Sequence, residues 1–289
     1  MKMKKSTLAV FLAPALILFC FVYLVPLVMV FVTSFCEWRL SQPIEFAGLY
    51  NYIKAFSDKN VLVAVVHTLI WVALQMTVHV GLGTLLAFIL AERFRGWKIY
   101  RTVCMLPNVI STAALAMILI NVFKTDSGLV NDLLSFIVGH DVQINWYFNT
   151  DTAFFTVTLG WLLYPGLITI LVLSAIAAVP TDCIAAARLD GATRFQVNTQ
   201  VILPMIRNTL GTCVIISGTS MLKEFELIFL STNGGPGNAT LNLPLYIYKL
   251  AFGDNNYGYS NAISVLLIVF GVFVVYVINR MFKMDESLT

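Results

Sequence analysis

The sequence predicts an all-α, polytopic membrane protein, a bundle of about six spanning helices with both termini on the cytoplasmic side. Hydrophobic residues make up 59% of the 289 residues and charged residues only 11%. The apolar residues lie in blocks of about 20, the length that crosses a bilayer as an α-helix. Basic residues concentrate in alternate connections between the blocks, as the positive-inside rule predicts for a multispan protein.

Six blocks are long enough to span the bilayer at the rise of an α-helix. The first block follows a basic start and is about twice as long as a signal-peptide core, so we expect it to be retained. No internal repeat is visible, and we expect one transmembrane domain over residues 1–289. The predicted spans are Leu8–Phe35, Leu62–Leu90, Thr102–Val122, Ala153–Ala178, Met205–Leu222 and Ala262–Ile278.

Orientation follows from the basic residues in the connections. With the N-terminus inside, 12 Lys and Arg residues lie on the cytoplasmic side and 6 on the other. The outer segments include Ser127–Gly139, which we expect to form a short amphipathic helix at the membrane surface with Ser127 as its cap. Ser231–Gly237 is rich in turn-forming residues.

The composition argues against several functional classes. The interiors of the spans contain no Asp, Glu, Lys or Arg, whereas ion-coupled carriers usually need such residues at depth. His79, within the second span, is more simply a packed, neutral histidine than a proton relay. The five cysteines have no metal-site or redox spacing, no acid–base cluster indicates an enzyme, and a net charge of +3 is too small to indicate nucleic acid.

Prolines and small residues shape the predicted spans. Pro107 and Pro165 either kink their helices and open a cavity or are ordinary membrane-helix prolines, and the sequence favours neither. Gly83 with Ala87, and Ser174 with Ala178, form small-xxx-small pairs suited to close helix packing.

The segment 180–204, between the fourth and fifth spans, is cytoplasmic by the charge bias. Pro180 starts a predicted helix that runs through an alanine triplet. The helix should break at Asp190-Gly191, where Gly permits a turn and Asp190 is placed to cap the next helix. By itself this pattern fits a helix–glycine–helix element that docks into a partner's groove, or equally a plain connector.

The same segment resembles the cytoplasmic signature loop of binding-protein-dependent ATP-binding-cassette importer permeases, whose usual form is Glu-Ala-Ala, then Asp-Gly-Ala, then Leu-Pro. The matching positions are Ala186, Ala187, Asp190, Gly191, Ala192, Leu203 and Pro204. The sequence departs from the usual form at Ala185, in place of the Glu, and at Asn198, in place of an aromatic residue. The resemblance implies a type I permease fold in which this loop forms the coupling helix that contacts the ATPase. The implied coupling residues are Ala185, Ala186, Ala187, Asp190, Gly191, Ala192, Leu203 and Pro204. The lost Glu removes a charged contact with the ATPase.

Further stretches, Phe46–Tyr52 and Thr232–Thr240 among them, are similar to the first permease of carbohydrate importers. The resemblance covers residues 8–281. It implies a sugar or oligosaccharide brought by an extracytoplasmic binding protein, a second permease subunit, and two ATPase subunits that hold the ATP and Mg²⁺. No cofactor or metal is expected in this chain, which lacks a phosphate-loop motif. The expected location is the bacterial inner membrane.

A neutral sugar needs aromatic platforms and uncharged hydrogen-bonding groups near the bilayer centre. The eligible residues are Gln75, Asn108, Asn121, Trp161 and Tyr164; for each, packing between helices is the simpler alternative. Asn233, Gly234 and Gly235, in the turn-rich outer loop, are the candidates to face the binding protein. Alternative functions are the import of another solute, such as glycerol phosphate, polyamine or peptide, on the same fold, and an ion-coupled secondary transporter.

Overall fold

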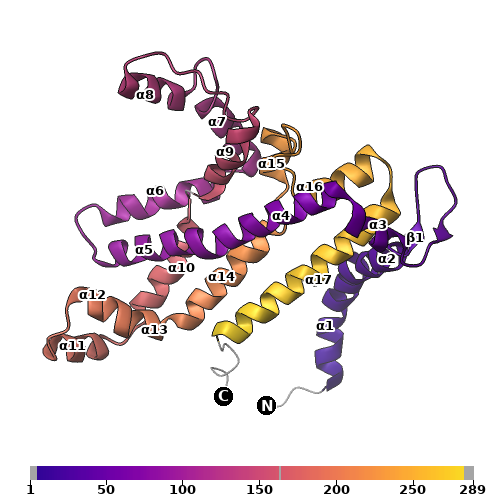
Figure 1. Ribbon diagram of the computed structural model, residues 1–289. Coiled ribbons are helices and arrows are strands. Elements are labelled where there is room, and N and C mark those ends of the chain that lie inside the picture. The colour runs from indigo at the N-terminus through magenta and orange to yellow at the C-terminus, as the bar shows by residue number, and fades with distance from the viewer. Residues whose placement is uncertain (1–4, 163, 283–289) are drawn as a thin grey trace. The chain divides into compact units, whose positions relative to one another are not determined.

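The computed structural model describes residues 5–162 and 164–282, and most of them are helical (Figure 1). The chain divides into two compact units. One comprises Met1–Leu62 with Tyr246–Val269, and the other comprises Val63–Leu245 with Phe270–Thr289. The long helices α4 and α17 pass from one unit into the other.

The first unit begins with the first span, Phe11–Thr33, which has a mean hydropathy of 2.9. No residue described in this span is buried, so its apolar surface must contact lipid or other subunits. A short antiparallel pair of strands follows, with Cys36 opposite Phe46. The elements of this unit are α1 (Lys5–Phe19), η1 (Cys20–Leu24), α2 (Val25–Thr33), β1 (Cys36–Glu37), β2 (Glu45–Phe46), α3 (Tyr50–Ser57), the start of α4 (Lys59–Leu74), most of α16 (Leu243–Tyr248), η4 (Lys249–Gly253) and the first half of α17 (Tyr257–Phe282).

Asp58 joins two distant parts of this unit. Its Oδ2 atom accepts hydrogen bonds from the hydroxyls of Tyr246 at 2.6 Å and Tyr259 at 2.8 Å, and Oδ1 accepts one from the Asn60 amide at 2.8 Å. Burial by itself raises the pKa of Asp58. The hydrogen bonds together outweigh burial, so the pKa lies below its ordinary value.

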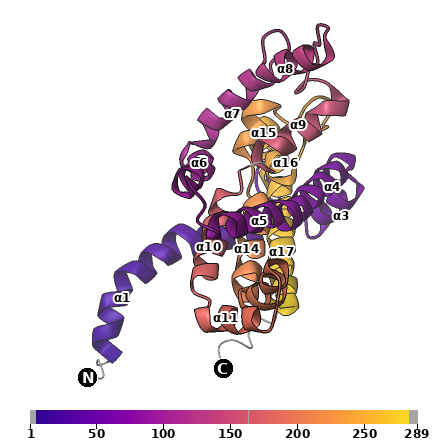
Figure 2. The same ribbon diagram turned by 90° about the vertical axis from the view of Figure 1, so that its left-hand side faces the viewer.

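The second unit holds the remaining spans and the segment between the fourth and fifth spans. Figures 1 and 2 show α11–α13 at one end of this unit and α8 at the other. Its further elements are η2 (Gln75–His79), α5 (Val80–Ala91), α6 (Trp97–Val109), α7 (Thr112–Val122), α8 (Leu129–Val138), α9 (Thr150–Leu162), α10 (Gly166–Ala177), α11 (Thr181–Leu189), α12 (Arg194–Gln196), η3 (Val197–Ile202), α13 (Leu203–Met205), α14 (Arg207–Met221) and α15 (Glu226–Ser231).

Six spans result if each bent helix pair counts as one. Four helical stretches are long and apolar enough to cross a membrane singly. Two further pairs are bent, Trp97–Val109 with Thr112–Val122 by 104° and Arg194–Met205 with Arg207–Ser231 by 72°. Each of the six predicted spans therefore corresponds to one stretch or one bent pair, with its ends shifted. Leu163, inside the predicted fourth span, lies outside the described residues.

The break in the third span follows Pro107 by a few residues. Proline lacks the N–H that would continue the helical ladder, and α6 ends at Val109. Ser111 then adopts an extended conformation and caps α7, its Oγ accepting the Ala114 amide at 3.3 Å. The two prolines therefore do accompany interruptions, since α9 ends just before Pro165 and α10 begins just after it.

Two local predictions are wrong. The helix at the outer surface begins at Leu129 after Gly128, so Ser127 does not cap it. A Cβ at Gly128 would lie 2.2 Å from the Lys124 carbonyl oxygen, which explains glycine at this position. Of the two small-residue pairs, Gly83 and Ala87 pack closely, whereas Ser174 and Ala178 are exposed in this chain.

Candidate coupling segment and transport pathway

The break at Gly191 is a defined helix stop. Gly191 has φ +82°, the left-handed conformation that side chains disfavour. The Ala192 amide donates to the Ala187 carbonyl at 3.0 Å and the Gly191 amide donates to the Arg188 carbonyl at 3.1 Å. These two hydrogen bonds form a Schellman motif, which satisfies the last carbonyls of α11 and turns the chain sharply.

The next helix is capped by Thr193, not by Asp190 as the sequence suggested. The Thr193 amide donates to Gln196 Oε1 at 2.7 Å, and the Gln196 amide donates to Thr193 Oγ1 at 3.4 Å. This is a reciprocal capping box. Asp190 instead occupies the C-cap of α11, because the glycine turn takes two further residues before the chain re-enters a helix.

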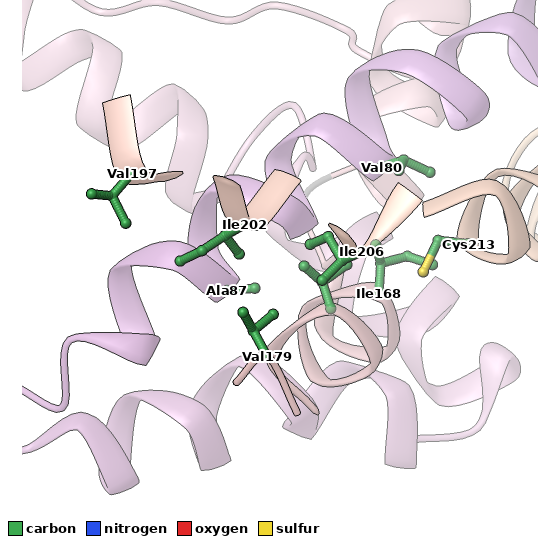
Figure 3. Close-up of a cluster of buried hydrophobic side chains, with 9 residues drawn as sticks. Val80, Ala87, Ile168, Val179, Val197, Ile202, Ile206 and Cys213 are labelled. Carbon is green, nitrogen blue, oxygen red and sulfur yellow. The ribbon is translucent and has the colours of Figure 1, made fainter. Parts of the chain in front are cut away.

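A buried apolar cluster attaches the predicted coupling segment, residues 180–204, to the membrane helices (Figure 3). Val197 and Ile202 of this segment pack in one cluster with side chains of α5, α10 and α14. Ala187 and Ala192, at the two sides of the turn, pack against its edge. The remaining members of the cluster are Val80, Ala87, Ile168, Val172, Val179, Ile206 and Cys213.

The opposite side of the segment is free for a partner. Ala185, Ala186, Asp190 and Gly191 are exposed. Two large apolar side chains that sequence reasoning missed, Leu189 and Phe195, are 88% and 75% exposed. Their signal in the sequence is the presence of bulky apolar residues in a short, otherwise polar connection. Leu203 is half-buried and Pro204 exposed at the start of the fifth span.

One ion pair also escaped prediction. Arg194, the first residue of α12, pairs with Glu92, which directly follows α5. Both side chains are substantially exposed, so the pair contributes little to stability by itself. It does join the coupling segment to the connection between the second and third spans.

Several spans of the second unit are interrupted, and two of the predicted pathway residues meet beside such breaks. Asn108, near the end of α6, donates from Nδ2 to the carbonyl of Tyr164 at 3.3 Å. Tyr164 lies in the non-helical step between α9 and α10. Helices α6 and α10 are in close contact there, because a Cβ at Gly166 would lie 2.2 Å from the Cys104 carbonyl oxygen. Broken helices at membrane depth are typical of transport sites.

Two further pathway candidates are buried with unsatisfied polar atoms. Gln75 is 7% exposed and Trp161 is 2% exposed. Within residues 5–162 and 164–282, Gln75 Oε1 and Trp161 Nε1 have no hydrogen-bond partner. The same two stretches of helix are joined nearby. Trp71 Nε1 donates to Thr158 Oγ1 at 2.8 Å, and His79 Nδ1 lies 3.4 Å from the Leu162 carbonyl oxygen. The histidine contact fits its predicted role as a packed, hydrogen-bonded residue.

Asn121 does not join these residues. Its Nδ2 donates to the Met117 carbonyl of its own helix at 2.8 Å, and it lies near the far end of α7 from the break.

Two residues of the fifth span were missing from the predicted set. Ser217, on α14, is 3% exposed and its Oγ finds no partner among the described residues. Glu224, between α14 and α15, is half-buried. One carboxylate oxygen accepts the Leu227 amide at 3.1 Å, and the group interacts electrostatically with Tyr164. Glu224 could have been found from the sequence, because an acidic residue so close to an apolar span is unusual.

The outer loop presents only part of its predicted surface. Asn233 is exposed, Gly234 is buried and Gly235 is half-buried. Thr232 and Thr240 close the loop through their hydroxyls at 2.6 Å, and both are buried. The part of the chain that the structure describes contains no cluster of three His, Cys, Asp or Glu side chains suited to a metal ion.

Residues 79–283, well over half of the chain, match the family described as binding-protein-dependent transport system inner membrane component. The chain belongs to this family. It is a permease of the inner membrane, as the resemblance of the signature loop implied. The predicted family is therefore confirmed.

Individual relatives agree with this assignment. The permease is 30% identical to the probable ABC transporter permease protein YurN of Bacillus subtilis, over 90% of both chains. It is 29% identical to the trehalose/maltose transport system permease protein MalF of Thermococcus litoralis, over 83% of this chain and 81% of that one.

The fold is also that of known permeases. The permease matches a chain in the crystal structure of a bacterial ABC transporter involved in the import of the acidic polysaccharide alginate, with a TM-score of 0.84. The match covers 96% of this chain and 95% of that chain at 23% identity. The all-α importer-permease fold predicted from the sequence is confirmed.

Proposed function

We propose that this permease translocates a neutral sugar or oligosaccharide delivered by an extracytoplasmic binding protein. ATP would be hydrolysed by two separate ATPase subunits, which hold the nucleotide and Mg²⁺, and a second permease subunit would complete the passage. The observation that carries this proposal is the coupling segment. It has an exposed docking face on one side and a buried anchor to the membrane helices on the other.

The docking face fits the end of a partner's groove. Ala185 and Ala186 keep the helix slim. Leu189 and Phe195 expose apolar surface that a docked partner would remove from water. Ala185 in place of the usual Glu leaves this contact mainly apolar. Closure of the ATPase pair on ATP would then move α11, and the bundle would alternate between two accessible states.

The cargo follows from the relatives and from the side chains near the helix breaks. One relative is named for trehalose and maltose transport, and the candidates Gln75, Asn108, Trp161 and Tyr164 are uncharged. Hydroxyl-rich solutes would satisfy the unpaired atoms of Gln75 and Trp161. Glu224, which interacts electrostatically with Tyr164, disfavours an anionic cargo such as a phosphorylated sugar.

Reconstitution of the permease with its co-purified subunits in proteoliposomes tests the energy source. We expect uptake to require ATP and the binding protein and to be unaffected by a protonophore alone. Uptake that collapses with the protonophore while ATP persists would indicate a secondary transporter. A thermal-shift screen of the binding protein against neutral, phosphorylated and acidic sugars identifies the cargo class.

The native Cys183 tests the docking face. This cysteine is exposed on α11, so a bifunctional thiol reagent should join it to the ATPase subunit, and Cys183→Ser should abolish the product. Crosslinking that persists in the variant would place the contact elsewhere. For the passage, Asn108→Ala should impair uptake more than Asn121→Ala, which removes a hydrogen bond only within α7.

A further inference from the structure

A cavity of about 390 Å³ lies at the end of the second unit that holds the coupling segment. The end of α5, the start of α6, the end of α10 and the start of α11 all contribute to it. Most of its walls are apolar, but two arginines, Arg93 and Arg101, also line it. A second cavity of about 340 Å³ shares Trp97 and Arg101 with the first and adds Lys98.

Arg93, Lys98 and Arg101 have no carboxylate partner among the residues that the structure describes. Glu92, next to Arg93, is engaged by Arg194 and lines a different cavity. Positive charge therefore collects beside apolar walls, a combination that fits an anionic amphiphile better than a small hydrophilic anion.

The position of the cavity favours a membrane lipid as the amphiphile. By the positive-inside bias these residues lie at the cytoplasmic face. Outward from the cavity, Ile99, Val103 and Leu106 of α6 are exposed and continue an apolar surface into the membrane-spanning region. Trp97 stands where the apolar and charged surfaces meet, the position that tryptophan favours at lipid headgroups.

We propose that this cavity binds the headgroup of an anionic phospholipid from the cytoplasmic leaflet, with its phosphate between Arg93 and Arg101 and its acyl chains along α6. Thr181 and Ile184 of α11 line the same cavity. A bound lipid therefore bridges α6 and the coupling helix and stabilises the arrangement in which this contact is formed.

Native mass spectrometry of the purified complex, titrated with phosphatidylglycerol or phosphatidylcholine, tests the site without requiring transport. Each basic residue near an anionic headgroup contributes roughly a fivefold gain in affinity. We expect Arg93→Gln and Arg101→Gln each to weaken phosphatidylglycerol binding about fivefold, and the double variant on the order of 25-fold. Binding of phosphatidylcholine should stay unchanged.

Arg95→Gln is the matched control, because Arg95 is an exposed cation of the same turn that lines neither cavity. Ser174→Leu fills part of the cavity without changing charge and should weaken phosphatidylglycerol binding as well. All variants are compared at equal recovery from size-exclusion chromatography.

Four results would overturn the proposal: the wild-type complex binds both lipids equally, Arg95→Gln weakens binding as much as Arg101→Gln does, millimolar inorganic phosphate displaces the lipid, or removal of the ATPase subunits abolishes lipid binding. The third result would assign the arginines to a soluble anion, and the fourth would place the site on a protein partner.

Discussion

Gly191 offers the sharpest test of how the coupling segment works. An added Cβ would meet no atom within 4 Å, so the effect of a substitution at this position comes from the backbone alone. An ordinary L-residue held at φ +82° costs about 1–2 kcal/mol. Asparagine tolerates this conformation better than alanine, and proline cannot adopt it because its ring fixes φ near −65°.

Proline also removes the amide that donates to the Arg188 carbonyl at 3.1 Å, a loss of about 1 kcal/mol. The Schellman turn cannot form in Gly191→Pro, and α11 loses its fixed direction. We expect uptake to decrease in the order Gly, Asn, Ala, Pro. Alanine should shift the local equilibrium by about 5- to 30-fold, and proline should abolish transport.

ATP-driven uptake in proteoliposomes at matched permease content is the measurement. Membrane insertion serves as the control, because residue 191 is exposed and lies outside the spans. Normal uptake by Gly191→Pro, or equal loss with asparagine and proline, would refute the argument that the turn sets the direction of α11.

Three other predictions rest on single contacts. Thr193→Ala should lower the free energy of unfolding by about 1 kcal/mol through loss of the capping box, whereas Asp190→Ala should lower it less. Thermal unfolding of the detergent-solubilised complex measures the stability of both variants. Asp58 has a lowered folded-state pKa, so its stabilising contribution is present above its unfolded pKa of about 4 and is lost as the pH falls through the folded value. The hydrogen-exchange protection factors of residues 246–260, which are corrected for the intrinsic pH dependence of exchange, should therefore fall on acidification in the wild type and be low at all pH values in Asp58→Asn. Gly83→Val would place a Cβ 2.7 Å from Ile168 and should destabilise the permease by about 1–3 kcal/mol, while Gly81→Val, where the added Cβ meets nothing within 4 Å, should be tolerated.

The sequence predicted the spans and the glycine stop because both depend on local features. Long apolar blocks and a glycine after an alanine-rich helix carry their own physical signals. The 104° bend of the third span was less visible, although Ser111 stands where a helix cap is expected. The choice of Thr193 over Asp190 as a cap depends on how many residues the turn uses, which the composition of the segment does not state.

The grouping of the pathway residues was beyond sequence reasoning for a different reason. Asn108 and Tyr164 are 56 residues apart, and no local pattern says that their helices break at the same level. By residue type Asn121 was as suitable a candidate as Asn108, but its side-chain amide donates a hydrogen bond within its own helix. Glu224 follows the predicted fifth span in the sequence, and only the structure brings it within electrostatic reach of Tyr164, 60 residues earlier in the chain.

The shared cluster of Figure 3 has a mechanical consequence. Tightly packed apolar interiors have low compressibility, so a force applied to the exposed side of α11 is not absorbed beneath it. Val197 and Ile202 belong to the same buried cluster as Ala87 and Ile168. If α11 is the ATPase contact as proposed, a force applied there displaces α5 and α10 together, and the movement is taken up at the interruptions farther along the same spans.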